Sequence, residues 1–510
     1  MSPTRARQAA QQAERPHSRA LRADVLGSFD TIVMAVAGSA PAYTLAATTA
    51  VLVGAAGLVS PAALLGCVIP MLGIAWAFNH LGKVDVNAGA SYSWVGRALH
   101  PSLGFLSGWA LVVSATIFMV AGALPAGSYT LSLFSASAAE NTWAATGVGA
   151  VWFVLMALLV LVGVRITAHA QWIMTGIEVL ILVAFGVSAL VHGAGQQHPA
   201  ALFSWSWLWG FGHFGGASGF AAAALVAAFY FWGWDVTANL SEETSNSRRN
   251  SGLGGLVGVV MVFALFEIVT IAVNLILTQK QIQADSGDLL TVLGDAVWPG
   301  WGGKVLVLAV MLSTIATLET TLIQVTRSLF AMGRDHTVSP AFGRSHPRWQ
   351  TPHIAVATVT VVSLVLFIAS NGLGSVNTIL TDAVSAIGLQ IAFYYGLAGF
   401  AVVVAYRRLL FKSFSNAFFI GLWPLVGALF MLWILVESLT TLSGEVIGIG
   451  MGALALGLLP MGWYWAKGSG YYRPARLDAA NAAAVAAEYG EEPDLVAAET
   501  GGHDVLPTDL

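Results

Sequence analysis

Charge is scarce in this sequence. Only 9% of its 510 residues are Asp, Glu, Lys or Arg, whereas 57% are hydrophobic. Soluble domains carry about 25% charged residues. A chain of this length and composition could not hide its apolar side chains from water in a soluble fold. The scarcity of charge therefore excludes a soluble globular protein and predicts one that lies in a membrane.

Cysteines and clustered metal ligands are equally scarce. Cys67 is the single cysteine and lies in an apolar run, which excludes an internal disulfide. No zinc or iron–sulfur ligand spacing occurs, and there is no phosphate-binding Gly-rich loop and no nucleophile–base pair at a credible spacing. We therefore expect no enzyme activity, no catalytic residue, no metal, no cofactor and no nucleic-acid partner.

Long apolar runs fill most of the chain. About 20 apolar residues suffice for a helix to cross the hydrocarbon core of a bilayer. Twelve runs of spanning length occur, near residues 28–57, 60–80, 92–124, 146–164, 170–192, 218–241, 253–278, 303–332, 353–370, 376–405, 415–437 and 445–466. The sequence thus predicts an all-α polytopic membrane protein with 12 transmembrane helices.

The distribution of positive charge supports this segmentation. With the N-terminus inside, every Lys and Arg falls on the inner side except Lys280 and Lys304. Loops on the cytoplasmic side carry such an excess of Lys and Arg. We expect a multi-pass protein of the cytoplasmic membrane with both termini in the cytoplasm. The chain is expected to consist of an N-terminal tail over 1–24, a transmembrane domain over 25–467 and an acidic C-terminal tail over 468–510.

Two of the apolar runs are interrupted. The first contains "AVAGSAPAYTLAAT", in which Gly38, Ser39 and Pro41 disfavour a continuous helix, and the sixth contains "FWGWD", with Gly233 and Asp235. The alternative is a pair of unrelated kinks. Paired interruptions at corresponding positions of two inverted repeats instead point to the central site of a transporter. The N-terminal end of a half-helix attracts a carboxylate and its carbonyl end suits an ammonium group, so the pair predicts a receptor for a zwitterion.

Three longer motifs resemble one family. They are "AGASYSWVGRALHPSLGFLSGW" (Ala88–Trp109), "FWGWDVTANLSEETSNSRR" (residues 231–249) and "TRSLFAMGRDHTVSPAFGRSHPRWQTP" (Thr326–Pro352). In this order and on the predicted side, they resemble the amino acid–polyamine–organocation permeases, and the resemblance extends over residues 25 to 465. It implies a leucine-transporter-like five-plus-five inverted repeat with helices 1 and 6 broken. Repeat 1 would span about 28–192 and repeat 2 about 218–405, with peripheral helices 11 and 12 at about 415–466.

The resemblance also implies a substrate site. In relatives, a Gly-Ser-Gly-type turn in helix 1 binds the substrate carboxylate, aromatic residues of helix 6 gate the site, and helix 8 faces helix 1. Pro41 lacks one of the expected donors, which leaves room for a substrate with no carboxylate, such as an amine. The substrate-binding residues expected here are Gly38, Ser39, Ala40, Ala42, Phe229, Phe231, Trp232, Gly233 and Glu319.

Acidic residues within the apolar runs are candidates for coupling and gating, because a carboxylate in a membrane is costly. Glu319 lies among threonines and could hold a proton or pair with a substrate ammonium. Glu178 lies near the helix 5 position at which some proton-driven relatives carry a titratable residue. We expect ion or proton coupling through Glu178, Glu319 and Thr320. The gating residues expected are Asp30, Asp235, Glu242, Glu243 and Arg327, with Asp235 alternatively capping the second half of helix 6.

Together these observations predict a secondary active transporter of amino acids or related amines that works by alternating access and is coupled to protons. Its partners would be the small-molecule substrate, protons and the lipid bilayer. The alternatives are a polyamine or organic-cation permease, an amino acid or amine exchanger, a sodium-coupled carrier, and a channel or non-transporting sensor. The sequence leaves the oligomeric state open.

Overall fold

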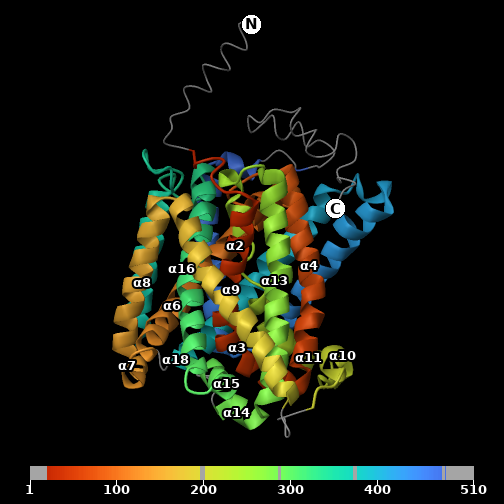
Figure 1. Cartoon of the computed structure of the whole chain (residues 1–510). Coiled ribbons are helices and arrows are strands. Elements are labelled where there is room, and N and C mark those ends of the chain that lie inside the picture. The colour runs from red at the N-terminus through yellow and green to blue at the C-terminus, as the bar shows by residue number, and fades with distance from the viewer. Residues whose placement is uncertain (1–19, 196–201, 285–288, 372–375, 474–476, 478–510) are drawn as a thin grey trace, which may run out of the picture.

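A bundle of long helices makes up the chain (Figure 1). The computed structural model describes residues 20–195, 202–284, 289–371, 376–473 and 477. Most of the predicted N-terminal and C-terminal tails lies outside these residues. Within them, the one β-type pairing is an isolated bridge between Leu26 and Thr244. The predicted all-α polytopic architecture is confirmed.

The described part of the chain has 10 helices that are long and apolar enough to cross a membrane. One of these apolar stretches, Ser28–Val84, is 57 residues long, covers the first two predicted segments and contains the three α-helices α2, α3 and α4. The sixth predicted segment corresponds to the shorter apolar helix Ala217–Tyr230. Every predicted segment thus has a helical counterpart, while the number of 12 separate spans stays a prediction.

The helices of the first predicted repeat follow the apolar runs closely. They are α2 (Ser28–Ser39), α3 (Pro41–Ala56), α4 (Ser60–Val84), α5 (Ser91–Ala98), α6 (Pro101–Ser132), α7 (Ala136–Glu140), α8 (Thr142–Val162) and α9 (Val164–Gly195). The predicted end of the third segment at residue 124 is wrong, because α6 continues through Pro125 to Ser132. Membrane helices tolerate such a proline because neighbouring groups bond to the backbone atoms that it leaves unpaired.

The second half of the chain has a similar series of helices. It comprises α11 (Ala217–Tyr230), α12 (Val236–Asn239), α13 (Ser247–Ile276), α16 (Gly302–Arg334), α17 (His353–Ser370), α18 (Val376–Ala405), α19 (Trp423–Thr441), α20 (Gly444–Leu456) and α21 (Leu458–Ala466). Short helices α10 (Ser206–Trp209), α14 (Gln279–Ala284) and α15 (Leu289–Val297) lie in the connections.

The helices differ widely in burial. The most apolar stretch of α16 is 83% buried, whereas the corresponding stretch over Gly444–Ala466 is only 22% buried. Helix α16 packs against α6, α9, α3 and α2, which places it at the centre of the bundle. The apolar stretches within Val164–Gly193 and His353–Ser370 are each 33% buried and that within Asn416–Thr441 is 39% buried, so the peripheral position of the last two spans stays a prediction.

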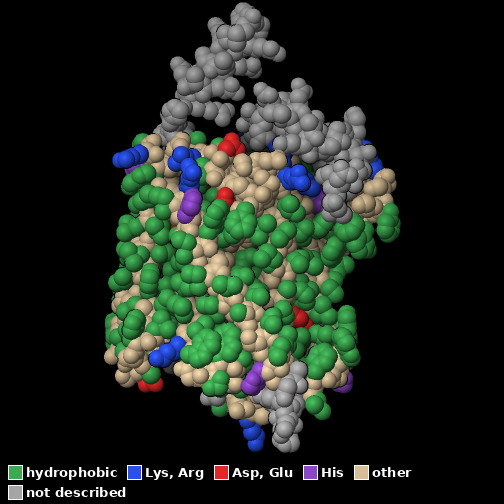
Figure 2. Space-filling view, in the orientation of Figure 1, with side chains coloured by type: hydrophobic (Ala, Val, Ile, Leu, Met, Phe, Trp, Pro, Cys, Tyr) green, Lys and Arg blue, Asp and Glu red, His purple; other side chains and the backbone are tan. Residues whose placement is uncertain are grey.

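The outer surface is divided into zones. Hydrophobic side chains cover the middle of the molecule, and Lys and Arg gather mainly at the end where α2 begins and α16 ends (Figure 2). We call this the basic end. An apolar band between polar ends is the surface that a bilayer requires.

Glycines allow close helix contacts in this bundle. A Cβ atom on Gly127 of α6 would collide with the Ala145 carbonyl of α8, and one on Gly149 of α8 would collide with the Ala123 carbonyl of α6. Gly147, also on α8, has open space where its side chain would be. Small residues thus bring these two backbones into direct contact.

We expect Gly149→Val to separate α6 from α8 and to lower stability by about 1–3 kcal/mol, as overpacking does in other cores. Gly147→Val is the matched control, because the same substitution on the same helix meets no neighbour. The measurement is the thermal unfolding midpoint of both purified variants in detergent. Equal midpoints for the two variants would contradict the assigned packing.

Candidate functional site

The first helix is broken at Ala40. Helix α2 ends at Ser39 and α3 begins at Pro41, and Ala40 between them adopts left-handed backbone angles, φ 47° and ψ 63°. A residue other than glycine costs about 1–2 kcal/mol in this conformation. Pro41 is the first residue of α3, a position at which its missing N–H would have no helical partner in any case. The proline that argues against a continuous helix therefore starts a new one.

The second break lies between α11 and α12, and it contacts the first. Gly233 has φ of +92°, which favours glycine. A Cβ atom on Gly38 would collide with the Gly233 carbonyl, and one on Gly233 would collide with the Gly38 carbonyl. The two interrupted helices thus meet backbone to backbone at these glycines.

The N-terminal end of α3 is bonded to side chains of the protein itself. The Ala42 N–H donates to Glu178 Oε1 of α9 at 2.8 Å, and the Tyr43 N–H donates to Ser313 Oγ of α16 at 3.2 Å. Glu178 is fully buried, and its second oxygen has no partner among the described residues. A carboxylate is favourable at this position because the exposed N–H groups of a helix start carry partial positive charge. Glu178 therefore supplies an anion at the start of α3.

The C-terminal end of α2 is bonded to α16. Thr317 Oγ1 donates to the Ala37 carbonyl at 2.8 Å. The hydroxyl of Thr320, which we expected to take part in coupling, donates within its own helix to Ala316 at 3.3 Å and Thr317 at 3.2 Å. Of these two threonines, Thr317 is thus the one that reaches the break, and sequence alone did not distinguish them.

Glu319 faces α9 rather than the break. Its Oε2 accepts a hydrogen bond from Gln171 Nε2 at 2.6 Å, and its Oε1 has no partner in the described part of the chain. Gln171 also donates to the Ala316 carbonyl at 2.8 Å. On α9, Gln171 and Glu178 are seven residues apart, which is about two helical turns or 10 Å along one face. Both buried carboxylates therefore belong to the interface between α9 and α16.

An aromatic cluster lies beside the two breaks. It consists of Tyr43, Phe118, Phe229 and Trp232, with ring centroids 5.8 Å apart for Tyr43–Phe118, 5.6 Å for Phe118–Trp232 and 6.2 Å for Phe229–Trp232. All four side chains are buried. Sequence analysis missed Phe118 and Tyr43, since neither stands out within its apolar run.

Phe231, also expected in the substrate site, has different neighbours. Its ring packs against Phe263 and Phe266 of α13, with centroid distances of 6.4 and 6.2 Å. Trp232, the next residue, packs in the aromatic cluster and donates from Nε1 to the Tyr394 hydroxyl at 2.8 Å. Of these two adjacent residues, Trp232 is therefore the better candidate for contact with a substrate.

Asp235 binds two tyrosines of α18. Its carboxylate accepts hydrogen bonds from the Tyr394 and Tyr395 hydroxyls, each at 2.9 Å. It precedes α12 directly but makes no side-chain capping bond there. The expectation that Asp235 caps the second half-helix is wrong, because two phenolic donors hold its carboxylate instead. The contact connects the second break to α18.

At the basic end, two carboxylate–guanidinium pairs connect the segment after α12 to α16. Glu243 accepts hydrogen bonds from Arg327 Nε at 2.9 Å and from Arg327 Nη2 at 3.1 Å. Both side chains are almost completely buried. Glu242 pairs with Arg334 at 2.6 and 3.0 Å and also accepts from the Ala88 N–H at 2.9 Å. Burial raises the pKa of Glu242, but the Arg334 guanidinium outweighs this and holds the pKa below its usual value. These pairs join the segment after α12 to the end of α16.

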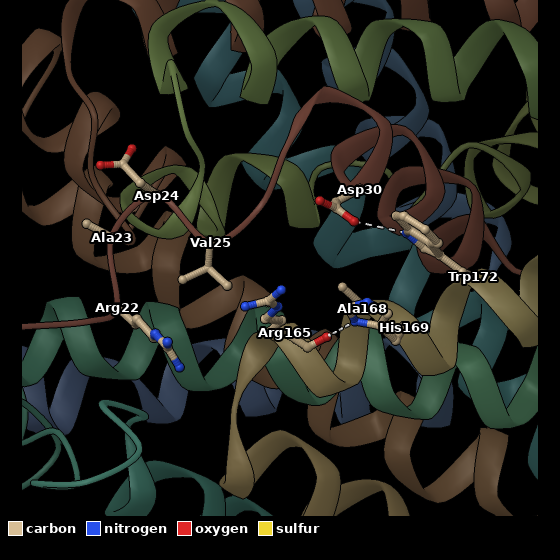
Figure 3. A pocket seen from close by; sticks show the side chains of 9 residues that line it. All are labelled: Arg22, Ala23, Asp24, Val25, Asp30, Arg165, Ala168, His169 and Trp172. Atoms are coloured by element: carbon tan, nitrogen blue, oxygen red, sulfur yellow. Dashed lines mark hydrogen bonds between the residues drawn. The ribbon is translucent and has the colours of Figure 1, made fainter.

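Asp30 is not part of those two pairs. Its carboxylate accepts from the Gly27 N–H at 2.6 Å and from Trp172 Nε1 at 2.9 Å, so it fastens the start of α2 to α9. It lines a cavity of about 470 Å³ at the basic end (Figure 3). Among the described residues, no group of three or more His, Cys, Asp or Glu side chains could hold a metal ion.

Comparison with known proteins agrees with the resemblance noted above. The sequence model described as "Amino acid permease" matches residues 26–453. The chain is 22% identical over 403 residues to the serine/threonine exchanger SteT of Bacillus subtilis, covering 77% of this chain and 86% of that protein. It is 23% identical over 420 residues to the low-affinity putrescine importer PlaP of Escherichia coli, covering 78% and 84%. It is 30% identical over 280 residues to the methylthioribose transporter of Bacillus subtilis, covering 52% of this chain and 57% of that protein.

Breaking the buried ion pair should be costly. We expect Arg327→Leu to destabilise the protein by about 3–5 kcal/mol, because it leaves the buried Glu243 carboxylate without its cation. Arg344→Leu, which removes an exposed arginine at the same end, should change stability by less than about 0.5 kcal/mol. The unfolding midpoint of the purified variants measures both effects.

The double variant Glu243→Leu with Arg327→Leu separates stability from gating. It should regain most of the lost stability, because no buried charge remains, but not transport into proteoliposomes. A double variant that transports at the wild-type rate would show that this ion pair has no part in gating.

Proposed function

Because the chain belongs to the amino acid permease family, we propose that it is a proton-coupled carrier of amino acids and related amines in which Glu178 carries the proton. The observation that supports this most directly is the hydrogen bond from the Ala42 N–H to the buried Glu178 carboxylate. It joins a titratable group to the broken helix, where a substrate would bind. The gathering of Lys and Arg at one end supports a location in the cytoplasmic membrane with both termini inside (Figure 2).

The proposed coupling is a competition for the start of α3. Ionised Glu178 holds the Ala42 N–H through a charge-assisted bond. Protonation removes the negative charge, weakens this bond and frees the helix start for another anion. A substrate carboxylate can then take the position, so the proton and the amino acid bind together. Release of both lets Glu178 return to Ala42.

The rest of the substrate would lie against the aromatic cluster. Its ammonium group suits the carbonyl ends of α2 and α11, and an aromatic face adds attraction for a cation. Opening toward the basic end requires the Glu243–Arg327 pair to separate, because this pair joins the segment after the second break to α16. Alternating access then consists of movement of the two broken helices against α9 and α16.

A polyamine or organic-cation carrier is the second candidate. The donors for a carboxylate are few, since Pro41 has no N–H, Ala42 binds Glu178 and Tyr43 binds Ser313. Glu319 supplies a buried carboxylate with one oxygen that has no partner among the described residues. A substrate with ammonium groups alone would not need the start of α3.

Glu178→Gln should remove proton coupling and leave exchange. A one-unit pH difference provides about 1.4 kcal/mol per proton, enough for about tenfold accumulation of substrate. In proteoliposomes, we expect the wild-type protein to accumulate substrate along such a gradient and Glu178→Gln to show only equilibration and counterflow. Glu267→Gln, at a membrane-embedded carboxylate of α13, is the control and should accumulate substrate normally. Accumulation by Glu178→Gln at the wild-type level would remove Glu178 from the mechanism.

Ligand binding at two pH values distinguishes the substrate classes. Ligands that bind the folded state raise its melting temperature. If the competition operates, α-amino acids should stabilise the purified protein more at the lower pH, and Glu178→Gln should lose this pH dependence. Stabilisation by diamines alone, with no response to amino acids at either pH, would instead favour the organic-cation carrier.

A further inference from the structure

An open cavity at the basic end has no part in the proposed transport cycle. Its volume is about 470 Å³, within the usual range for ligand sites. The segment Arg22–Val25, the first turn of α2 and the first turns of α9 form its walls (Figure 3). A smaller cavity of about 120 Å³ shares Arg22 and Arg165 with it and is also lined by Glu243.

Two arginines, Arg22 and Arg165, line the cavity together with two aspartates, Asp24 and Asp30. Arg22 and Arg165 are exposed, and neither forms an ion pair with a described residue. Of the carboxylates that line the cavity, Asp30 is bonded to Gly27 and Trp172. Figure 3 shows Asp30 beside Trp172, Asp24 on the segment that carries Arg22, and the Arg165 guanidinium between Arg22 and Asp30. A guanidinium group whose donors are not used within the protein is a preferred ligand of phosphate.

The surface next to the cavity is suited to lipid. Trp172, at its rim, is 41% exposed, and Phe29, which packs edge-on against it, is 59% exposed. Along α9, leading away from the cavity, exposed apolar side chains continue at Ile166, Ile173, Ile177 and Leu180. Tryptophan is enriched where hydrocarbon meets the headgroups, and basic pockets between membrane helices bind anionic headgroups.

We propose that this cavity binds the phosphate of an anionic membrane phospholipid between Arg22 and Arg165, with the acyl chains along the exposed face of α9. The site is also connected by hydrogen bonds to Glu243 of the Glu243–Arg327 pair. In the segment after Arg22, the N–H groups of Val25 and Leu26 donate to the Glu243 carbonyl at 2.9 and 3.1 Å. A phosphate that joins this segment to α9 therefore stabilises the arrangement in which Glu243 is paired with Arg327.

Thermal unfolding of the full-length protein in detergent tests the site. Phosphatidylglycerol should raise the melting temperature of the wild-type protein by at least about 3 °C, whereas phosphatidylcholine should have little effect. The double variant Arg22→Gln with Arg165→Gln should lose this shift. Arg344→Gln with Arg348→Gln, at two exposed arginines of the same end, is the matched control and should keep it.

Other outcomes would overturn the proposal. Equal loss of the shift in both double variants would indicate non-specific attraction to the basic end, and an unchanged shift in the Arg22/Arg165 variant would place the lipid elsewhere. Stabilisation by inorganic phosphate equal to that by phosphatidylglycerol would identify a site for soluble anions instead. If the double variant does not fold, Arg165→Lys, which keeps the charge but loses the bidentate geometry, should show a reduced shift, and an undiminished one would contradict the assignment.

Discussion

A membrane interior contains no water to bond to a broken helix, and the structure around the two breaks depends on this constraint. Each interruption frees backbone groups that a continuous helix would have paired. The first break is supported by side chains from helices distant in sequence: Glu178 and Ser313 bind the start of α3, and Thr317 binds the end of α2. These bonds fix α9 and α16 against the break. The supporting helices are therefore also the ones that must respond when the break changes its partners.

The contact between Gly38 and Gly233 imposes a second restriction. With backbone against backbone, neither glycine leaves room for a side chain, and the two interrupted helices are in direct contact at this point. The second break is bonded to a different helix: Asp235 accepts hydrogen bonds from Tyr394 and Tyr395 of α18. The two breaks thus form one central unit with separate attachments to the surrounding bundle. Such an arrangement suits a carrier, in which the centre and the surrounding helices move relative to each other.

Much of the architecture could be predicted from the sequence, because hydrophobicity and charge are local signals. The apolar runs gave most helix bounds within a few residues, and Gly38–Pro41 marked the first break because glycine and proline act on their own backbone. Glu243 and Arg327 could both be expected among the gating residues on the same predicted side, although Arg327 lies within its apolar run.

Side-chain direction could not be predicted in the same way. Phe231 and Trp232 are adjacent, but they follow the end of α11, where helical angles no longer fix which neighbours each ring meets. The contact of Glu319 with Gln171 depends on the rotation of α16 against α9, which no pattern within either helix determines. Phe118 carries no local signal at all, because it is one aromatic residue in a long apolar run.

The bond between Glu178 and Ala42 also bears on how an unloaded carrier behaves. A helix start whose N–H groups have no hydrogen-bond partner would be unstable in a low-dielectric interior. A carrier with such a helix start could change conformation only with substrate bound. Here the Glu178 carboxylate accepts from the Ala42 N–H, so under the proposed coupling the unloaded molecule would have a stable form in which to reorient. Under the proposed coupling, such a resident carboxylate would permit net uptake rather than obligatory one-for-one exchange.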